Sequence, residues 1–270
     1  MKRLLIAGCG DLGVRLADRL AGDTWQVHGL RRNTEALPEG IIPVRADLSD
    51  PASLVHLDAD WDAVVYQATP DAYDEAGYRS AYLDGLANLF DRIRARRLVF
   101  VSSTAVYGQE SGEWVDEESD TEPARFNGRV LIEAETLARR SAPESVVVRF
   151  AGIYGPGRDY LLRKVAAGEA RCREQPPQWT NRIHSEDCAG VLEHLLLLDG
   201  PAPLYCASDG KPAPRCEVLD WLAGRLHAPA PVRDQSSGGQ GKRVSSARLL
   251  ASGYRLIHPD YRSGYQEMLQ

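Results

Sequence analysis

Three glycines near the start of the chain have the spacing of a loop that binds dinucleotides. Gly8, Gly10 and Gly13 form the pattern Gly-x-Gly-x-x-Gly between an apolar stretch and an amphipathic one. In that setting the first glycine allows a tight turn, the second lets the backbone approach a pyrophosphate, and the third lets a helix pack closely on a strand. The helix would begin at Asp11 and Leu12, where free N–H groups and a partial positive charge suit phosphate. These five residues are therefore predicted to bind a cofactor, and a glycine turn without a ligand is the alternative.

Two arginines further along the chain bear on which dinucleotide binds. A site for NAD usually places an acidic residue at the end of the second strand, where it accepts a hydrogen bond from the ribose. Here Arg31 and Arg32 end an apolar stretch instead, and two guanidiniums suit a 2′-phosphate by charge and by geometry. The pattern favours NADP, with NAD as the alternative, unless the arginines are only solvated surface charges. Asp47 and Leu48 follow the third strand and are predicted to lie at the adenine.

Short apolar stretches alternate with longer amphipathic ones over the first 150 residues. The expected strands cover residues 2–7, 25–30, 41–45, 63–68, 98–102 and 145–150, and the expected helices cover residues 12–20, 78–96 and 126–140. Strands separated by helices predict βαβ units, and hence an α/β protein with a Rossmann-type doubly wound parallel sheet. The ends of the fourth and fifth strands would then carry the remaining expected cofactor contacts, which are Gln67, Ala68, Thr69 and Ser102.

The composition and the hydrophobic pattern of the sequence change after residue 150. Glycine and proline become frequent and the regular alternation fades. A helix around residues 187–198 is expected to return to the sheet, and the rest has the character of a smaller, irregular α/β lobe. We therefore expect an NAD(P)-binding Rossmann domain over residues 1–150, with a returning segment at about 180–200, and a smaller C-terminal substrate-binding lobe over most of residues 151–270.

Composition and charge exclude several classes of function. The chain has 270 residues and a formal net charge of −6, which is a poor match for a nucleic-acid binder with its basic face. No apolar stretch approaches the ~20 residues that a membrane-spanning helix needs. The five cysteines are scattered, odd in number and without a Cys-x-x-Cys pair, so neither a disulfide framework nor a metal site is expected. We expect a reduced, cytoplasmic protein.

Four further segments resemble motifs of the extended short-chain dehydrogenase/reductase superfamily, in its NAD(P)-dependent epimerase/dehydratase family. Residues 101–108 read Val-Ser-Ser-Thr-Ala-Val-Tyr-Gly, similar to the family's Ser-Ser-x-x-Val-Tyr-Gly after the fifth strand. Residues 149–157 resemble its Arg-x-x-x-x-Tyr-Gly-Pro-Gly motif, residues 181–187 its Ile-His-x-x-Asp motif, and residues 242–254 its closing segment. The resemblance spans most of the chain and implies the same fold, a bound NAD(P) and a contact to it from Tyr154.

The resemblance also implies a catalytic set of Ser or Thr, Tyr and Lys. The tyrosine exchanges a proton with the substrate, and the lysine lowers its pKa, because a phenol near pKa 10 is a poor base at pH 7 without a nearby cation. Ser103 takes the place of the serine, with a turn-capping serine as the alternative. Asn127 stands at the position of the tyrosine and Leu131 at that of the lysine. Asn127 cannot act as a base and Leu131 carries no charge.

Lysine is scarce, which limits where a replacement pair could be. Only four of the 32 basic residues are lysines, and Lys164 alone has a tyrosine four residues before it. Tyr160 and Lys164 follow the Tyr-Gly-Pro-Gly motif, where the family begins a helix of its substrate lobe. We therefore expect a lobe helix there rather than a relocated catalytic pair. Tyr107, Tyr154 and His184 are the remaining stand-ins, each with a structural alternative, and Tyr107 is retained as a catalytic candidate.

Two functions fit this pattern. The first is an atypical NADP-dependent oxidoreductase that lacks the Tyr-x-x-x-Lys relay and uses Ser103 to polarise a carbonyl. The second is a dinucleotide-binding sensor or partner-binding protein without turnover. Thr180 and Ala105 replace residues that the family's sugar-nucleotide epimerases and dehydratases use, which disfavours both of those activities. The resemblance implies a small-molecule substrate, such as a sugar or another carbonyl or hydroxyl compound, and is compatible with a homodimer.

Overall fold

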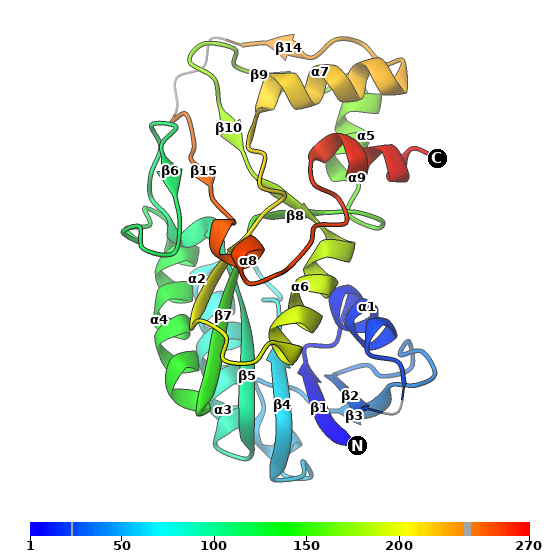
Figure 1. The fold of residues 1–270 in the computed structure, drawn as a ribbon, viewed down its shortest axis with the longest axis vertical. Coiled ribbons are helices and arrows are strands. Elements are labelled where there is room, and N and C mark those ends of the chain that lie inside the picture. The colour runs from blue at the N-terminus through cyan, green and yellow to red at the C-terminus, as the bar shows by residue number, and fades with distance from the viewer. Residues whose placement is uncertain (23, 235–238) are drawn as a thin grey trace. The chain divides into compact units, whose positions relative to one another are not determined.

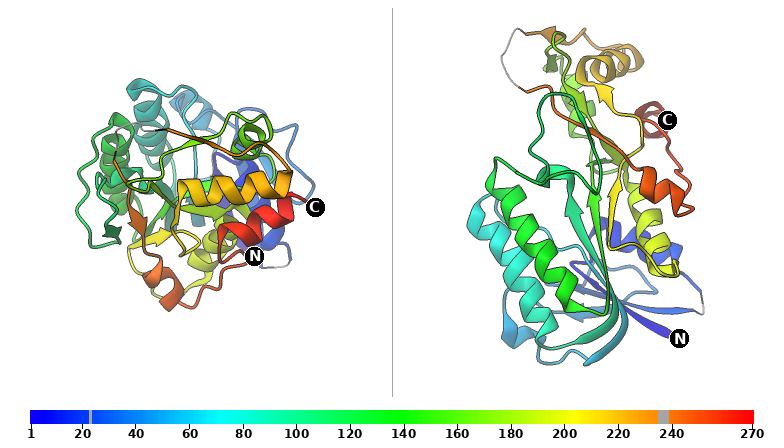
Figure 2. Two further views of the ribbon diagram at one scale, coloured as in Figure 1. Left: turned by 90° about the horizontal axis from the view of Figure 1, so that it is seen from above. Right: turned by 60° about the vertical axis from the view of Figure 1, so that its left-hand side comes forward.

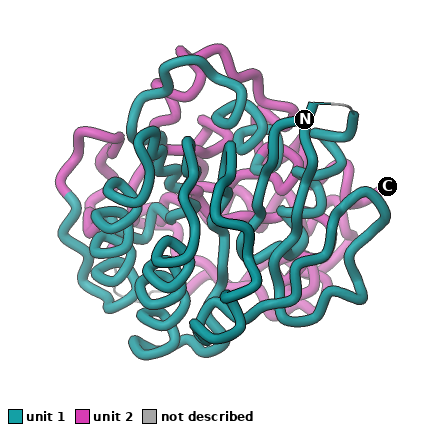
Figure 3. Tube along the Cα trace, turned by 90° about the horizontal axis from the view of Figure 1, so that it is seen from below, with its two compact units in different colours: residues 1–107, 121–149, 188–205 teal, residues 108–120, 150–187, 206–270 magenta. Residues whose placement is uncertain are grey.

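The computed structural model describes residues 1–22, 24–234 and 239–270 (Figure 1). The chain divides into two compact units, each built from several stretches of sequence (Figure 3). Unit 1 comprises residues 1–107, 121–149 and 188–205, and unit 2 comprises residues 108–120, 150–187 and 206–270. The chain therefore leaves unit 1 and returns to it twice. No helix in the described ranges combines the length and the apolar character that crossing a membrane requires.

Most of a seven-stranded sheet with the order β12-β7-β5-β4-β1-β2-β3 lies in unit 1. Its strands are β1 (Lys2–Ala7), β2 (Trp25–Arg31), β3 (Ile42–Arg45), β4 (Asp60–Tyr66), β5 (Arg94–Ser103), β7 (Glu144–Phe150) and β12 (Leu204–Ala207). The neighbours among β1 to β5 pair in parallel, with Leu4 of β1 opposite Val27 of β2 and Ala63 of β4. The central strands are buried apolar runs, as parallel sheets covered on both faces require. The expected Rossmann-type doubly wound sheet is confirmed.

Helices lie on both faces of this sheet (Figures 1 and 2). One layer contains α2 (Glu75–Arg79), the π-helical turn η2 (Ser80–Asp84), α3 (Gly85–Phe90) and α4 (Phe126–Ser141), and the other contains α1 (Asp11–Arg19) and most of α6 (Ser185–Leu197). Two short 3-10 turns, η1 (Pro51–Leu54) and η3 (Thr104–Val106), follow β3 and β5. Leu86, Leu89, Ala134 and Ala138 of the first layer pack with Phe100 of β5 in one buried core.

The helix expected over residues 78–96 ends earlier than predicted. Helix α3 stops at Phe90, and β5 begins at Arg94, where Arg94 and Ala95 pair with Asp60 and Trp61 of β4. Pairing with the neighbouring strand outweighs the helical spacing of the apolar residues here. The other expected elements of the first 150 residues differ from the observed ones by a few residues at their ends.

Unit 2 is made of short elements. They are β6 (Trp114–Val115), β8 (Gly152–Tyr154), α5 (Tyr160–Ala166), β9 (Arg171–Cys172), β10 (Trp179–Thr180), β11 (Arg182–His184), β13 (Ala213–Pro214), α7 (Arg215–Leu226), β14 (Val232–Arg233), β15 (Arg243–Val244), α8 (Ala247–Ala251) and α9 (Tyr261–Met268). The strands pair two by two, and a buried core joins Val165 of α5, Leu219 and Leu222 of α7, and Tyr261 of α9. Tyr160 begins α5, so the expected lobe helix at this position is confirmed.

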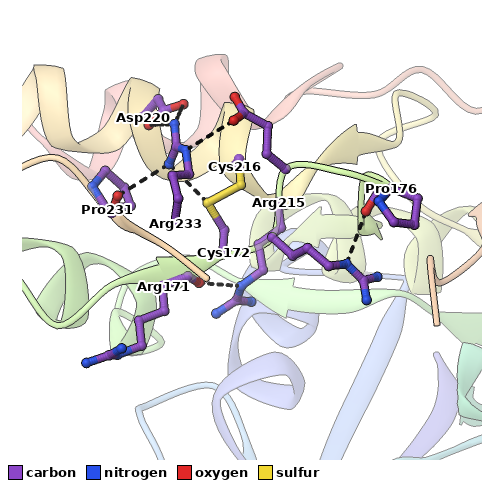
Figure 4. Close-up of a disulfide and its surroundings, with 10 residues drawn as sticks. Arg171, Cys172, Pro176, Arg215, Cys216, Asp220, Pro231 and Arg233 are labelled. Atoms are coloured by element: carbon purple, nitrogen blue, oxygen red, sulfur yellow. Dashed lines mark hydrogen bonds and ion pairs between the residues drawn. A yellow bond between two sulfur atoms is a disulfide. The ribbon is translucent and has the colours of Figure 1, made fainter. Parts of the chain in front are cut away.

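A disulfide joins Cys172 of β9 to Cys216 in the first turn of α7 (Figure 4). The two residues are 44 positions apart in sequence, and their Cα atoms lie 5.3 Å apart, within the range that such a bond requires. The expectation that all the cysteines are reduced is therefore wrong for this pair. Spacing along the chain could not reveal it, because the pairing depends on β9 and α7 meeting in the folded unit. Cys9, Cys188 and Cys206 are buried thiols.

Candidate functional site

A cleft of about 360 Å³ opens at the carboxyl ends of strands β1 to β4, within unit 1. The strand order reverses between β1 and β4, and open α/β sheets bind their ligands at such a point. The loop after β1 lines the cleft with Gly8 and Gly10, and the end of β2 lines it with Arg31 and the next residue, Arg32. The loops after β3 and β4 line it with Asp47, Leu48, Ala68 and Thr69. The structure thus gathers eight of the predicted cofactor contacts in one space.

The three glycines of the first loop have three different surroundings. Gly8 has φ +82°, and a Cβ on it would lie 2.7 Å from the backbone of Ala68, so this turn requires glycine. Gly10 is exposed, and a Cβ on it would meet nothing closer than 3.9 Å. A Cβ on Gly13 would lie 2.4 Å from Nε2 of Gln67, so glycine lets α1 pack closely. The backbone of this glycine loop is therefore open to a ligand at Gly10, and such an open backbone fits a pyrophosphate.

Four other predicted contacts near this loop do not line the cleft. Leu12 is a buried residue of α1, and Gly13 packs against Gln67. The Gln67 amide donates to the carbonyl of Gly8 over 3.4 Å, so Gln67 supports the loop from behind. Asp11 is exposed in the first turn of α1, where its carboxylate accepts a 3.0 Å hydrogen bond from Arg15. A direct contact from any of these side chains to a ligand stays a prediction.

The two arginines at the end of β2, Arg31 and Arg32, have different partners. Nη1 of Arg31 donates to the carbonyl of Cys9 over 3.3 Å, which places its guanidinium beside the glycine loop. Burial raises the pKa of the Cys9 thiol to about 11, and the charge of Arg31 opposes that rise. Arg32 forms a bidentate pair with Asp71, with two N–O distances of 2.6 Å. Asp71 also lines the cleft, and its hydrogen bond from Arg32 lowers its pKa. Sequence reasoning missed Asp71, because it lies in a loop without a motif.

The proposed adenine side of the cleft is an ordered turn. The Asp47 carboxylate accepts hydrogen bonds from the backbone N–H of Ser49 at 2.9 Å and from its hydroxyl at 2.7 Å. The carbonyl of Leu48 accepts a 2.9 Å hydrogen bond from the side chain of Asn88. These contacts fix the turn that presents Asp47 and Leu48 to the cleft, and their contact with an adenine stays a prediction.

A buried charge network holds the end of β5. Ser102 donates a 2.7 Å hydrogen bond to Glu135, and Arg149 donates two more to the same carboxylate at 2.9 and 2.7 Å. Arg149 also donates to the Tyr107 hydroxyl at 2.8 Å, with its guanidinium 5.0 Å from the ring centre. Burial would lower the pKa of Arg149, but the hydrogen bonds and charge of Glu135 raise it. Ser102 and Tyr107 thus have structural partners, and their cofactor and catalytic roles stay predictions.

Ser103 lies at the start of the next turn and is half-buried. Its Oγ accepts a 3.2 Å hydrogen bond from the backbone N–H of Ala105, which caps η3. Helix α4 packs directly on this turn, because a Cβ on Gly128 would lie 2.5 Å from the carbonyl of Ala105. Asn127 precedes Gly128, and Leu131 follows one turn later and is buried. The turn that begins at Ser103 therefore packs against the start of α4, the helix that carries the two substituted positions.

Tyr154 and His184 both lie in unit 2, buried, with ring centres 5.2 Å apart. The Tyr154 hydroxyl has no hydrogen-bond partner among the described residues, and burial raises its pKa. His184 also lies 4.1 Å from the ring of His258, and His184, His258 and Glu267 hold one donor atom each within 4.8 Å of one another. A contact from Tyr154 to a cofactor stays a prediction.

Comparison with known proteins identifies the family. The model of the NAD dependent epimerase/dehydratase family matches residues 4–200. The chain belongs to this family. The resemblance that its motifs indicated is therefore confirmed, and the glycine loop and the end of β5 described above both lie in the matched region.

Individual members of the epimerase/dehydratase family and other relatives match nearly the whole chain. Protein YeeZ of Escherichia coli (strain K12) is 30% identical and covers 96% of this chain and 97% of its own length. A 3-diazoavenalumate denitrifying reductase from a Streptomyces species is 27% identical, covering 97% of this chain and 98% of its own. A solved structure from Methylobacillus flagellatus, assigned to the NAD-dependent epimerase/dehydratases, is 38% identical with a TM-score of 0.85, covering 99% of this chain and 97% of that one.

Proposed function

We propose that the protein is an NADP(H)-dependent oxidoreductase, an atypical epimerase/dehydratase family member that acts on a small carbonyl or hydroxyl compound without a Tyr-x-x-x-Lys relay. The observation that carries this proposal is the cleft at the ends of β1 to β4, where glycine backbone and two guanidiniums meet. The Streptomyces relative is named as a reductase, which supports reduction as the class of reaction. Residues 1–150 would bind the nucleotide and residues 151–270 the substrate, with a homodimer as part of the same proposal.

The residues of the cleft fit a dinucleotide. The open backbone at Gly10 and the N-terminus of α1 suit the pyrophosphate, and Arg31 and Arg32 suit a 2′-phosphate. Asp47 and Leu48 would lie at the adenine. When bound, the reduced nucleotide supplies a hydride to a carbonyl carbon. The chain itself would then have to bind the carbonyl oxygen, for which Ser103 is the candidate, and to supply its proton.

Asp71 complicates the preference for NADP in a way that can be measured. Its carboxylate already pairs with Arg32, so a 2′-phosphate has to compete with it for the guanidinium. With NAD instead, a carboxylate in this cleft could accept hydrogen bonds from the ribose hydroxyls. The carboxylate of Asp71 should therefore weaken the binding of NADP and strengthen the binding of NAD.

The test compares the affinities of NADPH and NADH in three variants. Arg32→Ala is expected to weaken NADPH about 10–100-fold and to change NADH little, because a charge-assisted bidentate contact is lost. Asp71→Asn is expected to tighten NADPH. Arg45→Ala is the control, since Arg45 pairs with Arg31 across β2 and β3 but does not line the cleft. Equal losses for both nucleotides in Arg32→Ala, or weaker NADH binding in Asp71→Asn, would favour NAD.

The second candidate function is a dinucleotide sensor or partner-binding protein without turnover. It is favoured by Asn127 and Leu131, which occupy the two positions of the family's relay. NADPH oxidation in the presence of a panel of aldehydes and ketones separates the two functions. Tight NADPH binding without oxidation supports the sensor, and absence of binding for either nucleotide contradicts both.

A further inference from the structure

The disulfide of unit 2 lies beside an arginine side chain. Nη1 of Arg233 donates to Sγ of Cys172 over 3.1 Å, and the two residues are direct neighbours where β14 pairs with β9. Nη2 of the same guanidinium donates to both oxygens of Asp220, at 2.8 and 2.7 Å, which fixes its position beside the sulfur (Figure 4). A cationic N–H donor therefore points at one sulfur of the bond.

This contact gains strength when the disulfide is reduced. A disulfide sulfur is neutral, but a reduced cysteine can lose its proton, and a neighbouring guanidinium favours the thiolate. Burial acts in the opposite direction, because Cys172 is 2% exposed. The carboxylates of Asp220 and Glu174 also oppose the thiolate, but they contact the guanidinium of Arg233, whereas its N–H contacts the sulfur itself. We therefore expect the net effect to lower the pKa of the reduced Cys172 thiol.

The other sulfur belongs to Cys216 in the first turn of α7, a helix of 12 residues. The N-terminus of a helix carries a partial positive charge, which also favours a thiolate. Cys216 is 7% exposed, so it is the more accessible residue of the pair. The charged residues on either side of it, Arg215 and Glu217, have partners on β9 and α9. An attacking thiol is therefore expected to reach Cys216 first.

The two sulfurs are thus unequal in thiol–disulfide exchange. Exchange is faster when the departing thiol has a lower pKa. Attack on Cys216 makes Cys172 the departing sulfur, and the donor from Arg233 then stabilises the charge that develops on it. Attack on Cys172 would bring a second group into the more deeply buried position. Access and charge therefore favour the same direction of attack.

We propose that Cys172 and Cys216 form a site of reversible thiol–disulfide exchange with a dithiol. One thiolate of the dithiol bonds to Sγ of Cys216, and the electron pair of the protein disulfide leaves on Sγ of Cys172. The second thiolate of the dithiol then attacks the mixed disulfide and releases Cys216. The dithiol loses two electrons and two protons and becomes a disulfide, and both protein cysteines end reduced.

Reduction would release the covalent link between β9 and α7. Strand β9 would then be held by its two-residue pairing with β14 and by the core of unit 2. Because a crosslink of this kind stabilises the fold, opening it costs stability, and the contact between Arg233 and the thiolate offsets part of that cost. The exchange site is therefore a redox-sensitive restraint on unit 2. It does not involve the nucleotide cleft, so it stands or falls separately from the proposed function.

The first test measures how fast dithiothreitol reduces the bond in the full-length protein, with released thiols alkylated and counted by mass. Arg233→Gln is expected to slow reduction about 3–10-fold, because the departing thiol loses its stabilising donor. Arg225→Gln is the matched control, since it removes an equal charge from the exposed last turn of α7 and should leave the rate unchanged.

Two results of this test would overturn the proposal. Unchanged or faster reduction in Arg233→Gln would show that the arginine only holds the bond in place, because a loosened structure exposes a disulfide to attack. Equal slowing in Arg233→Gln and Arg225→Gln would show an effect of overall charge rather than of the contact with the sulfur.

The second test does not depend on exchange. In Cys216→Ser, Cys172 is a thiol, and its pKa is obtained from the ultraviolet absorbance of thiolate after subtraction of Cys172→Ser/Cys216→Ser, which cancels the three buried thiols. A pKa below the ordinary value of about 8.5 is expected. Adding Arg233→Gln should raise it by about one unit or more. A pKa of about 8.5 or higher in Cys216→Ser, or one that Arg233→Gln leaves unchanged, would overturn the role of Arg233.

A third measurement identifies the attacked sulfur and the source of the dithiol. Thioredoxin that lacks its second active-site cysteine is expected to be trapped in a mixed disulfide with Cys216, and trapping on Cys172 would overturn the assigned direction. Reduction by dithiothreitol but not by intact thioredoxin supports exchange with small dithiols. Reduction of the folded protein by neither would overturn the proposal and leave the disulfide as a structural crosslink alone.

Discussion

Each unit buries an arginine near a carboxylate. Among the described residues, only the pair of unit 1 is joined by hydrogen bonds between the two side chains. In unit 1, Arg149 and Glu135 share two hydrogen bonds, and hydroxyls from neighbouring residues complete the network. In unit 2, Arg182 and Asp209 are 7% and 2% exposed. Nη1 of Arg182 and Oδ2 of Asp209 have no hydrogen-bond partner in the described part of the chain. The unpartnered Tyr154 hydroxyl belongs to the same unit.

The buried pair of unit 1 is therefore a structural support, whereas the buried polar side chains of unit 2 form a cluster whose hydrogen bonding is incomplete. A fully hydrogen-bonded buried ion pair fixes one arrangement, and here it fixes the end of β5 next to Ser103. A buried polar cluster with unused donors and acceptors is instead where water or a polar ligand completes the hydrogen bonding. The electrostatics agree, because burial raises the pKa of Asp209 to about 7, although its hydrogen bond from Lys211 and the charge of Arg182 oppose the rise.

Removing the carboxylate of unit 1 is expected to have the largest effect. Glu135→Ala leaves Arg149 buried without its partner, which costs about 3–5 kcal/mol of unfolding free energy. Glu133→Ala is the matched control, since Glu133 lies two residues earlier in α4 and forms an exposed pair with Arg79 worth at most about 1 kcal/mol. Denaturant unfolding of both variants measures the difference. Similar losses in the two variants would show that the buried network is not a structural support.

Breaking the disulfide of unit 2 is expected to have the next largest effect. Closing a chain segment of this length stabilises a fold by about 2–4 kcal/mol, mainly by restricting the unfolded chain. In Cys172→Ser/Cys216→Ser, faster hydrogen exchange is therefore expected in β9 and α7, with unit 1 unchanged. A thiol reductant should reproduce the effect in the wild type and leave the double variant as it is. A uniform loss of protection across both units would contradict a stabilising role confined to unit 2.

The sequence predicted the fold well where local pattern and tertiary packing agree. Strands β1 and β7 are apolar runs bounded by turns, and α4 has a clear helical period, so their positions could be predicted. The start of β5 could not, because residues 94–97 read Arg-Ala-Arg-Arg and contain no apolar run that would indicate a strand. Arg97 is buried there because it pairs with Glu144 and donates to three carbonyls at the end of α6. That pairing is visible only in the folded chain.

The candidate site shows the same division. The glycine loop would contact a ligand through its backbone, so the spacing of the glycines alone was enough to predict that Gly8 and Gly10 line the cleft. Asp71 could not be predicted, because it gains its importance from Arg32, a side chain distant in sequence.

The smallest expected effect concerns the carboxyl of Asp209, and its sign depends on pH. Its pKa is about 7 in the folded protein, against an ordinary value of 3.8, so between these values the folded chain holds a proton that the unfolded chain has lost. The free energy of unfolding should therefore fall as pH rises from about 4 to 7 and level off above that range. Asp209→Asn should remove this slope, so its stability relative to the wild type should increase as pH rises from about 4 to 8.

A neighbouring carboxyl provides a control of opposite sign. The control is Asp260. Burial would raise its pKa, but hydrogen bonds from the backbone of Ser263 and from Lys211 lower it below the ordinary value. Its stabilisation is present at neutral pH and is lost as pH falls through the lowered pKa, so Asp260→Asn should destabilise at neutral pH and match the wild type in acid. Thermal midpoints of the wild type and both variants between about pH 2 and pH 8 test the pair, because the pKa of Asp260 lies below its ordinary value of 3.8. If Asp209→Asn keeps the wild-type slope, the incomplete cluster of unit 2 does not control its pH dependence, and the contrast with unit 1 loses its electrostatic part.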